Sequence, residues 1–277
     1  MLVDILGGHP WHSWPAAIVG TALISAAAYE LFVMARGVSA PFLDVGVLGT
    51  AIAFNLPWIA AREQWPLAYD ALLTAVVLLA FVRMERRFSK GKPNALPDMA
   101  VTLFGVFYVG ILGGYIVQIH QLPAKDVAAW GPALVLYFVA VSKMSDIGGY
   151  LFGKFLGKHK LAPAISPGKT IEGSAGGLLL SLAAAFGLAW LLPWQFSLSW
   201  TIIFAVLVNV TSQFGDLAES MLKRGCNVKD SAVFLPKVCG ALDLVDSILI
   251  SAPVAYYLMK IAENSLPLRE AAENSGI

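Results

Sequence analysis

Long apolar runs alternate with short polar breaks along most of this chain. A helix that spans the hydrocarbon core of a bilayer needs about 20 mostly apolar residues, and eight runs approach that length. The breaks between them hold proline, glycine or charged residues, which end helices or favour the membrane surface. The pattern therefore predicts eight membrane helices, at Trp14–Met34, Phe42–Ala61, Ala68–Met84, Met99–Ile119, Trp130–Met144, Ser174–Leu192, Leu198–Phe214 and Val245–Ile261.

The composition points in the same direction as the pattern. Hydrophobic residues make up 58% of the 277 residues and charged residues 13%, whereas a soluble domain carries about a quarter charged residues. We therefore expect an all-α polytopic membrane protein, with residues 1–277 forming a single integral membrane domain. The net charge of +1 gives no reason to expect a nucleic-acid partner. Cys226 and Cys239 match no disulfide framework or metal motif, so we expect ordinary thiols.

Positive charge is unevenly distributed between the predicted loops. Lys and Arg concentrate after the third, fifth and seventh spans, and the intervening loops hold few. Because short loops rich in Lys and Arg stay in the cytoplasm, we expect the loops after spans one, three, five and seven there, and both termini outside. The basic residues of these three loops are Arg83, Arg86, Arg87, Lys90 and Lys92; Lys154, Lys158, Lys160 and Lys169; and Lys223, Arg224, Lys229 and Lys237.

Three groups of polar residues occur where a membrane helix should be apolar, all in the region 143–261. The first begins with Asp146 at the end of the fifth span and continues in a loop that holds Ser166, Lys169, Thr170 and Glu172. A glycine-rich helix start follows this basic loop, and free backbone N–H groups there would favour a phosphate. The string GKT is not a P-loop, because the G-x-x-x-x-G-K-[ST] spacing is absent and we expect no strand before it. The alternative is a positive-inside loop with small residues at a helix interface.

The second group lies where the seventh span turns polar. Asp216, Glu219, Ser220 and Lys223 occur at positions i, i+3, i+4 and i+7, so one helical face carries all four side chains. Ionisable groups at membrane depth are costly and usually functional. The alternative is a helix end with surface ion pairs.

The third group opens the last span. Asp243 and Asp246 are three residues apart and share one helical face. Their repulsion is tolerable if a cation lies between them, and Mg²⁺ is usually held by one or two carboxylates and by substrate phosphates. An N-cap at Asp243 is the alternative. Together the three groups, all on the predicted cytoplasmic side, indicate phosphoryl or nucleotidyl transfer, in which positioning and charge neutralisation carry most of the catalysis.

The stretch from Ser220 to Ser247 resembles the signature of the phosphatidate cytidylyltransferases, also called CDP-diacylglycerol synthases. That pattern reads approximately S-x-x-K-R-x4-K-D, then a proline, H-G-G, and D-R-x-D. The upstream strings SQFGDLAES, DIGGYLFGKFLGKHKLAPAISPGKTIEG and YELFVMAR also look like this family, so the resemblance covers the chain from about Ala26 onward. The positions that fit the signature are Ser220, Lys223, Arg224, Lys229, Asp230, Pro236, Gly240, Asp243 and Asp246.

The resemblance implies a reaction of CTP with phosphatidic acid that gives CDP-diacylglycerol and pyrophosphate. It implies Mg²⁺ as cofactor, with room for a second cation, and membrane lipid as a partner. We expect a site facing the cytoplasm in a bacterial inner membrane, and a homodimer is an open alternative. The implied metal ligands are Asp216, Asp243 and Asp246, with Lys223 as a further catalytic residue. The implied substrate-binding residues are Arg224, Lys229, Asp230, Gln213, Ser220, Ser166, Lys169, Thr170, Glu172 and Asp146.

The chain departs from the family pattern at three positions of the signature. The family's histidine is Val238 here, the glycine after it is Cys239, and the arginine between the two aspartates is Leu244. Reduced activity is therefore one expectation. The family typically has one more span near its amino terminus. This sequence starts in a polar stretch, so two alternatives stay open, that the span is missing or that the start is truncated.

Two other classes of function stay open at this point. A CTP-dependent lipid kinase of the dolichol or phytol type would release CDP and not pyrophosphate. A catalytically degenerate relative would bind lipid or CTP without turnover, as the lost histidine and arginine would allow. A transporter is disfavoured, because the acids cluster at one membrane face and no matched pair of broken helices occurs in two halves.

Overall fold

The computed structural model describes residues 14–63, 68–91, 95–122, 131–189, 197–229 and 240–265. Its contacts divide the chain into two compact units, which are described separately. Of the described residues, those in 14–118 and in Gly215–Leu249 form the α2–α6 unit, and those in Ile119–Phe214 and in 250–265 form the α7–α8 unit. Two helices, α9 (Leu198–Gly225) and α10 (Ala241–Ser265), pass from one unit into the other. The expected single domain therefore stays a prediction.

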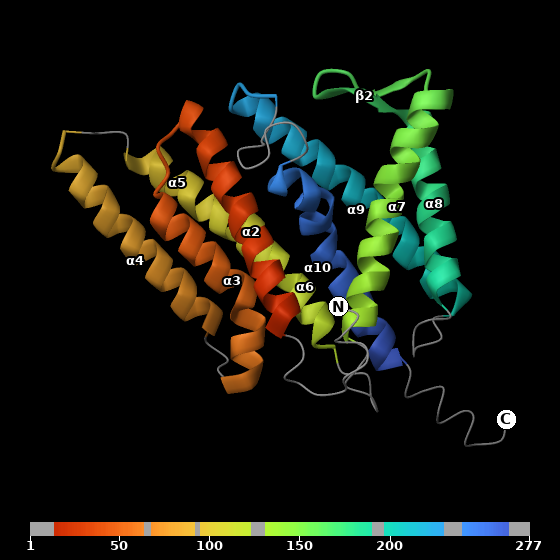
Figure 1. Ribbon diagram of the computed structural model, residues 1–277, viewed down its shortest axis with the longest axis horizontal. Coiled ribbons are helices and arrows are strands. Elements are labelled where there is room, and N and C mark those ends of the chain that lie inside the picture. Colours follow the sequence, from red (N-terminus) through yellow and green to blue (C-terminus); the bar gives the residue numbers. More distant parts are fainter. Residues whose placement is uncertain are drawn as a thin grey trace. The chain divides into compact units, whose positions relative to one another are not determined.

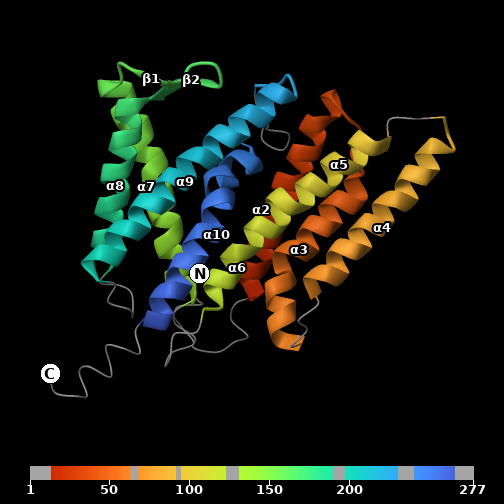
Figure 2. The same ribbon diagram turned by 180° about the vertical axis from the view of Figure 1, so that it is seen from behind.

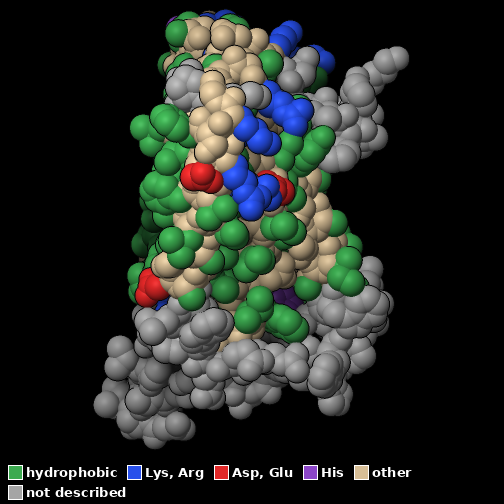
Figure 3. All heavy atoms as spheres, turned by 90° about the vertical axis from the view of Figure 1, so that its left-hand side faces the viewer, with side chains coloured by type: hydrophobic (Ala, Val, Ile, Leu, Met, Phe, Trp, Pro, Cys, Tyr) green, Lys and Arg blue, Asp and Glu red, His purple; other side chains and the backbone are tan. Residues whose placement is uncertain are grey.

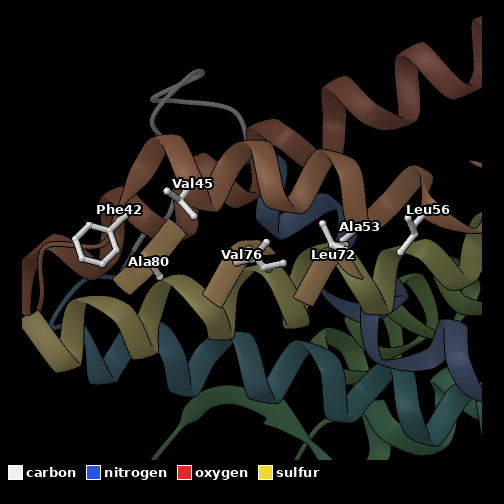
Figure 4. Packing of buried hydrophobic residues seen from close by; sticks show 8 residues of the cluster. Phe42, Val45, Ala53, Leu56, Leu72, Val76 and Ala80 are labelled. Carbon is white, nitrogen blue, oxygen red and sulfur yellow. The ribbon is translucent and has the colours of Figure 1, made fainter. Parts of the chain in front are cut away.

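The α2–α6 unit is built from helices that pack on their neighbours in the sequence (Figure 1). Leu72, Val76 and Ala80 recur every fourth residue along α4, so they form one buried stripe that packs against α3. Figure 4 shows this stripe beside side chains from the α3 segment. The elements are α2 (Trp14–Met34), the 3₁₀ turn η2 (Ala35–Gly37), α3 (Leu43–Glu63), α4 (Ala68–Phe88), α5 (Ala95–Gly105), the π-helical η3 (Val106–Ile111) and α6 (Leu112–His120).

Polar side chains fix the start of α3. Asp98 and Thr102, one turn apart on α5, accept hydrogen bonds from the backbone N–H groups of Ala40 and Phe42, at 2.6 and 2.8 Å. The guanidinium of Arg87, in the last turn of α4, donates to Asp98 and to the Ala40 carbonyl. The connections that follow α2 and α4 therefore lie at the same end of this unit.

The α7–α8 unit is organised by one close helix pair and a hairpin. Helices α7 (Gly131–Leu156) and α8 (Ile171–Ala189) lie side by side in both ribbon views (Figures 1 and 2). A Cβ atom added to Gly148 would lie 2.5 Å from the carbonyl oxygen of Gly176, so only glycine allows this approach. In the connection from α7 to α8, β1 (Lys160–Ala162) pairs antiparallel with β2 (Ser166–Thr170). The first part of α9 also belongs to this unit.

The hairpin corrects one prediction from the sequence. We expected an irregular loop around the string GKT, with no strand before the next helix. Gly168, Lys169 and Thr170 in fact belong to β2, which runs directly into α8. The P-loop interpretation still fails, because the required glycine spacing is absent and the string lies inside the strand.

Seven helices in the described part of the chain are long and apolar enough to cross a membrane, so the protein is an integral membrane protein. The third of the eight predicted spans, Ala68–Met84, is helical in α4 but is not among them. Asp70 and Arg83 leave only residues 71–82 uncharged there, which is shorter than a bilayer core requires. A membrane crossing by α4 therefore stays a prediction. The seven helices are Pro15–Gly37, Leu43–Ala60, Ala95–His120, Gly131–Leu156, Ile171–Ala189, Leu198–Gly225 and Ala241–Ala262.

The outer surface agrees with a lipid environment. Figure 3 shows a face on which hydrophobic side chains cover the middle and Lys and Arg gather in the upper half. The exposed large apolar side chains of α4 are Leu73, Leu78, Leu79, Phe81, Val82 and Phe88. Such contiguous exposed apolar surface is expected where lipid tails, and not water, surround the helix.

Candidate functional site

Three carboxylates from two helices meet within the α2–α6 unit. Asp216 and Glu219 lie on α9 and Asp246 lies on α10, and one oxygen of each falls within 4.8 Å of the others. Glu219 and Asp246 are buried, and Asp216 is half-buried. We call these three residues the carboxylate cluster. Buried acids at such close range need a compensating cation or proton.

The close crossing of α9 and α10 creates this cluster. A Cβ atom added to Gly215 would lie 2.6 Å from the Asp246 carbonyl oxygen and 3.0 Å from the Ser247 Cα. The backbones therefore touch at Gly215, which places the next residue, Asp216, beside the first turns of α10. Glu219 follows on the same face of α9 because it lies three residues further on.

Lys223 connects this cluster to Asp243. Its ammonium group lies 2.9 Å from an oxygen of Glu219 and also donates to Asp243 Oδ1. The other Asp243 oxygen accepts the backbone N–H of Gly240 at 3.2 Å. Asp243 thus occupies the third position of α10 and reaches back to the residue before the helix, as in a capping box. The alternative of an N-cap at Asp243 is therefore wrong, because α10 begins at Ala241 and Gly240 precedes it.

The predicted metal ligands are only partly brought together. Asp216 and Asp246 lie in the carboxylate cluster as expected, whereas Asp243 lies on Lys223 and is replaced in the cluster by Glu219. The signal for Glu219 was present in the sequence, since its spacing from Asp216 already placed it on the same face. Glu219 was not among the predicted metal ligands.

The donor chemistry of the cluster fits a magnesium ion. All three side chains offer carboxylate oxygens, which are hard ligands, and Mg²⁺ is commonly held by a few carboxylates together with substrate phosphates. Lys223 supplies one positive charge against Glu219 and Asp243 together, so the cluster keeps an excess of negative charge when its acids are ionised. A divalent cation would offset that excess.

Glu30, on α2, also holds the start of α10 in place. This fully buried carboxylate on α2 accepts the backbone N–H of Leu242 at 3.0 Å. The positive end of the α10 dipole and a free N–H group both favour a negative charge there. Glu30 therefore fixes the turn from which Asp243 and Asp246 project.

We expect Glu30→Ala to lower the stability of the detergent-solubilised protein by about 1.5–3 kcal/mol, the usual loss for a buried hydrogen bond to a charged group. Glu30→Gln keeps an oxygen acceptor and should lose less. Thermal unfolding of the two variants checks this order. Equal melting temperatures for Glu30→Ala and the wild type would show that the Leu242 contact does not stabilise α10.

The predicted nucleotide-loop residues lie on β2 and in the first turn of α8. Thr170 Oγ1 accepts the N–H of Gly173 at 3.1 Å and so caps α8. Glu172 accepts the backbone N–H of Lys158 at 3.0 Å and contacts the His159 ring nitrogen Nδ1 at 2.6 Å. Ser166 and Lys169 are half-buried on β2. Thr170 and Glu172 thus shape the hairpin, and a role of this group in binding nucleotide stays a prediction.

Removing the Glu172 carboxylate should loosen the start of the hairpin. We expect Glu172→Ala to speed tryptic cleavage after Lys158 and Lys160 by about tenfold, because cleavage follows local opening. Glu85→Ala is the control, since this exposed residue bonds only locally to Ser89. Identical cleavage rates in Glu172→Ala and wild type would show that the contacts of Glu172 with Lys158 and His159 do not hold the hairpin in place.

Polar residues that ended the predicted spans lie inside longer helices. Helix α7 continues to Leu156 beyond Met144, and α9 continues to Gly225 beyond Phe214. Their polar groups are satisfied by one another, as between Ser142 and Ser212 at 2.8 Å, Ser145 and Asn209 at 2.7 Å, and Lys143 and Asp146 at 3.1 Å. Asp146 is therefore paired within α7.

Gln213 makes a second polar link in this unit. Its amide nitrogen donates to the Ser174 carbonyl at 3.2 Å and to Asn209 at 3.0 Å, and its oxygen accepts from the Ser174 hydroxyl. The amide thus joins α8 to α9, and direct substrate binding by Gln213 stays a prediction.

The remaining predicted residues lie in the last turns of α9 and in the segments beyond it. Ser220 is half-buried, and Arg224 and Lys229 are exposed. Asp230, Val238 and Cys239 lie outside the described residues, and Leu244 is exposed on α10. Partial burial raises the pKa of the Cys226 thiol, so this cysteine stays protonated at neutral pH and is a poor nucleophile.

Comparisons with known proteins agree on one family. The cytidylyltransferase family matches residues 2–262. Phosphatidate cytidylyltransferase of Chlamydia trachomatis is 29% identical over 266 residues, which cover 92% of this chain and 87% of that protein. The Synechocystis enzyme of the same name is 30% identical over 281 residues, covering 92% and 90%. The Bacillus subtilis enzyme is 38% identical over 194 residues, covering 69% and 67%. With a match over nearly its whole length and a carboxylate cluster inside the matched region, the chain belongs to the cytidylyltransferase family.

Proposed function

We propose that this protein transfers a cytidylyl group from CTP to phosphatidic acid in phospholipid biosynthesis. The observation that carries the proposal is the carboxylate cluster, formed by α9 and α10 within and beside the segment that resembles the family signature. The names of the relatives support the same substrates. The alternative, a CTP-dependent lipid kinase, finds no support among these names.

The chemistry needs little from the protein beyond positioning and charge. A phosphate oxygen of phosphatidic acid attacks the α-phosphorus of CTP, and the bond from that phosphorus to the β-phosphate oxygen breaks. Pyrophosphate leaves with both electrons of that bond. The attacking phosphate is already ionised near neutral pH, so no general base is required.

Residues of the α2–α6 unit would supply the positioning. Asp216, Glu219 and Asp246 would hold Mg²⁺, which when bound neutralises charge on the phosphates. Lys223 keeps Glu219 and Asp243 in place through its two ion pairs. Arg224, Lys229 and Asp230 are proposed to contact the triphosphate or the lipid headgroup. In the α7–α8 unit, the residues proposed to bind the nucleotide are Ser166, Lys169, Thr170 and Glu172.

We further propose that the site faces the cytoplasm in a bacterial inner membrane. Within the α2–α6 unit, Arg87 contacts Ala40, and Gly37 packs against the carbonyl of Cys226. The connections after α2, α4 and α9 therefore lie at one end, which agrees with the predicted alternation of basic loops. A homodimer stays an expectation.

The direct test is an assay of the purified protein in detergent micelles with phosphatidic acid, Mg²⁺ and CTP labelled at the α-phosphate. Label in the lipid phase with release of pyrophosphate is expected. In a parallel assay with dolichol or phytol in place of phosphatidic acid, transfer of the γ-phosphoryl group to the lipid hydroxyl with release of labelled CDP would identify a lipid kinase instead. Binding of CTP without turnover would indicate a degenerate relative, and Val238→His with Leu244→Arg would then be the first substitutions to restore activity.

A further inference from the structure

A tyrosine that the sequence pattern did not single out lies near the carboxylate cluster. Tyr108 belongs to η3 of the α2–α6 unit, and only 5% of its surface is exposed. Its hydroxyl has no hydrogen-bond partner among the described residues. The charged groups that act on it electrostatically are Asp246, Glu219 and Asp216, which are the three members of the cluster.

The backbone around Tyr108 is unusual for a membrane helix. The helix that begins at Ala95 changes to π-helical geometry over Val106–Ile111 and then returns to α-helical geometry. A π-helical turn is less favourable than an α-helical one, and such turns are frequent at functional sites. The extra residue in the turn changes the direction of the side chains relative to a regular helix, so it decides where Tyr108 points.

Contacts on both sides keep this turn in place. A Cβ atom added to Gly110 would lie 3.0 Å from the Thr50 Cα, so the turn rests directly on the α3 backbone. A Cβ atom added to Gly105 would overlap the ring of Phe32 on α2. The Tyr108 ring stacks on Phe104, with centroids 5.4 Å apart and planes 8° from parallel. The hydroxyl is therefore held by a rigid support.

A buried hydroxyl donor without an acceptor is costly, and a fixed ring cannot turn to find one. The cost is understandable if the acceptor arrives with a ligand. A phosphate oxygen is such an acceptor, and a cation at the carboxylate cluster would bring phosphates there. A neutral phenol also suits this place, because it donates a hydrogen bond without adding positive charge that would compete with the cation.

We propose that the Tyr108 hydroxyl donates a hydrogen bond to a substrate phosphate oxygen bound at the carboxylate cluster. This inference rests on the proposed function, since it requires a phosphate-bearing substrate at that cluster. The phosphate is that of CTP or that of phosphatidic acid. Tyr108 is then a catalytic residue of this site, in addition to the acids and lysine of the signature.

The test removes only the hydroxyl, with Tyr108→Phe in the full-length protein. We expect kcat/KM to fall about 10- to 100-fold, as for the loss of a hydrogen bond to a charged group. KM is measured separately for CTP and for phosphatidic acid, and the substrate whose KM rises is the one that Tyr108 contacts. A fall in kcat alone would show that Tyr108 contacts an oxygen of the phosphate group that reacts. Thermal unfolding in the same detergent should show a melting temperature equal to or above that of the wild type.

Tyr137→Phe is the matched control. Tyr137 is a similarly buried tyrosine on α7, whose ring lies 5.1 Å from that of Phe204 at a tilt of 34°. Loss of its hydroxyl should leave the kinetics unchanged. Unchanged kcat and KM values in Tyr108→Phe, with an active wild type, would overturn the inference and leave the proposed function standing. A wild type that fails to transfer label would instead remove the proposed function itself.

Discussion

Asp216→Asn is expected to lower cytidylyl transfer by at least ~1000-fold while the protein keeps its fold. The substitution keeps the shape of the side chain but removes one negative charge from the carboxylate cluster. A bound metal supplies several kcal/mol of charge stabilisation, and each 1.36 kcal/mol corresponds to about a factor of ten in rate. Asp216 is half-buried at the crossing of α9 and α10, so Asn can occupy its place without a cavity. Initial rates with labelled CTP over a range of Mg²⁺ concentrations would measure the loss.

Asp70→Asn provides the control for this variant. Asp70 is an exposed acid in the first turn of α4, and its loss should leave the rate within about twofold of the wild type, as for most surface substitutions. A wild-type rate in Asp216→Asn would exclude Asp216 as a ligand. A large drop in melting temperature would instead assign the loss to misfolding.

Gly215→Ala should lower both activity and stability, because α9 and α10 touch at this residue. The added methyl group would lie 2.6 Å from the Asp246 carbonyl oxygen, and a backbone atom cannot turn away as a side chain could. Overpacking of this kind costs about 1–3 kcal/mol. Separating the helices also moves Asp216 from Asp246, and a displacement of about 1 Å in an active site can cost a factor of about 100 in rate.

The same helix offers a control for this second variant. Gly225 is the last residue of α9, and an added Cβ would have no neighbour within 4 Å. Gly225→Ala should therefore keep full activity. Assays are run well below the melting temperature of Gly215→Ala, so that lost rate reflects geometry in the folded protein. Normal turnover in Gly215→Ala would show that α9 and α10 can move apart without a loss of activity.

Much of the membrane part of the fold could be predicted from apolar runs alone. The first helix, Trp14–Met34, was predicted at both of its ends. Helices α7 and α9 were predicted too short, because charged residues interrupt their apolar patterns. These residues are Lys143 and Asp146 in α7, and Asp216 and Glu219 in α9. Polar groups of the two helices are satisfied by partners far away in the sequence, such as Asn209 for Ser145, which no local pattern can indicate.

The candidate site was predictable as a region and less so in its details. The spacing of Asp216 and Glu219 placed both on one face, but the choice between Glu219 and Asp243 as partner of Asp246 depends on where Lys223 points. The strands of the hairpin are three and five residues long and carry no clear alternation, so the segment was predicted as a loop. The π-helical turn at Tyr108 depends on contacts with α2 and α3 and left no local signal.

The hydrogen bond between Glu30 and Leu242 has a consequence for biogenesis. These residues are separated by 212 positions in the chain. At a synthesis rate of 5–20 residues per second, roughly 10–40 s pass between them on the ribosome. Helix α2 therefore enters the bilayer with a carboxylate whose partner does not yet exist, and α10 later supplies that partner. A nascent chain that stops before Leu242 cannot make this contact, which gives the cell a chemical difference between an unfinished protein and a finished one.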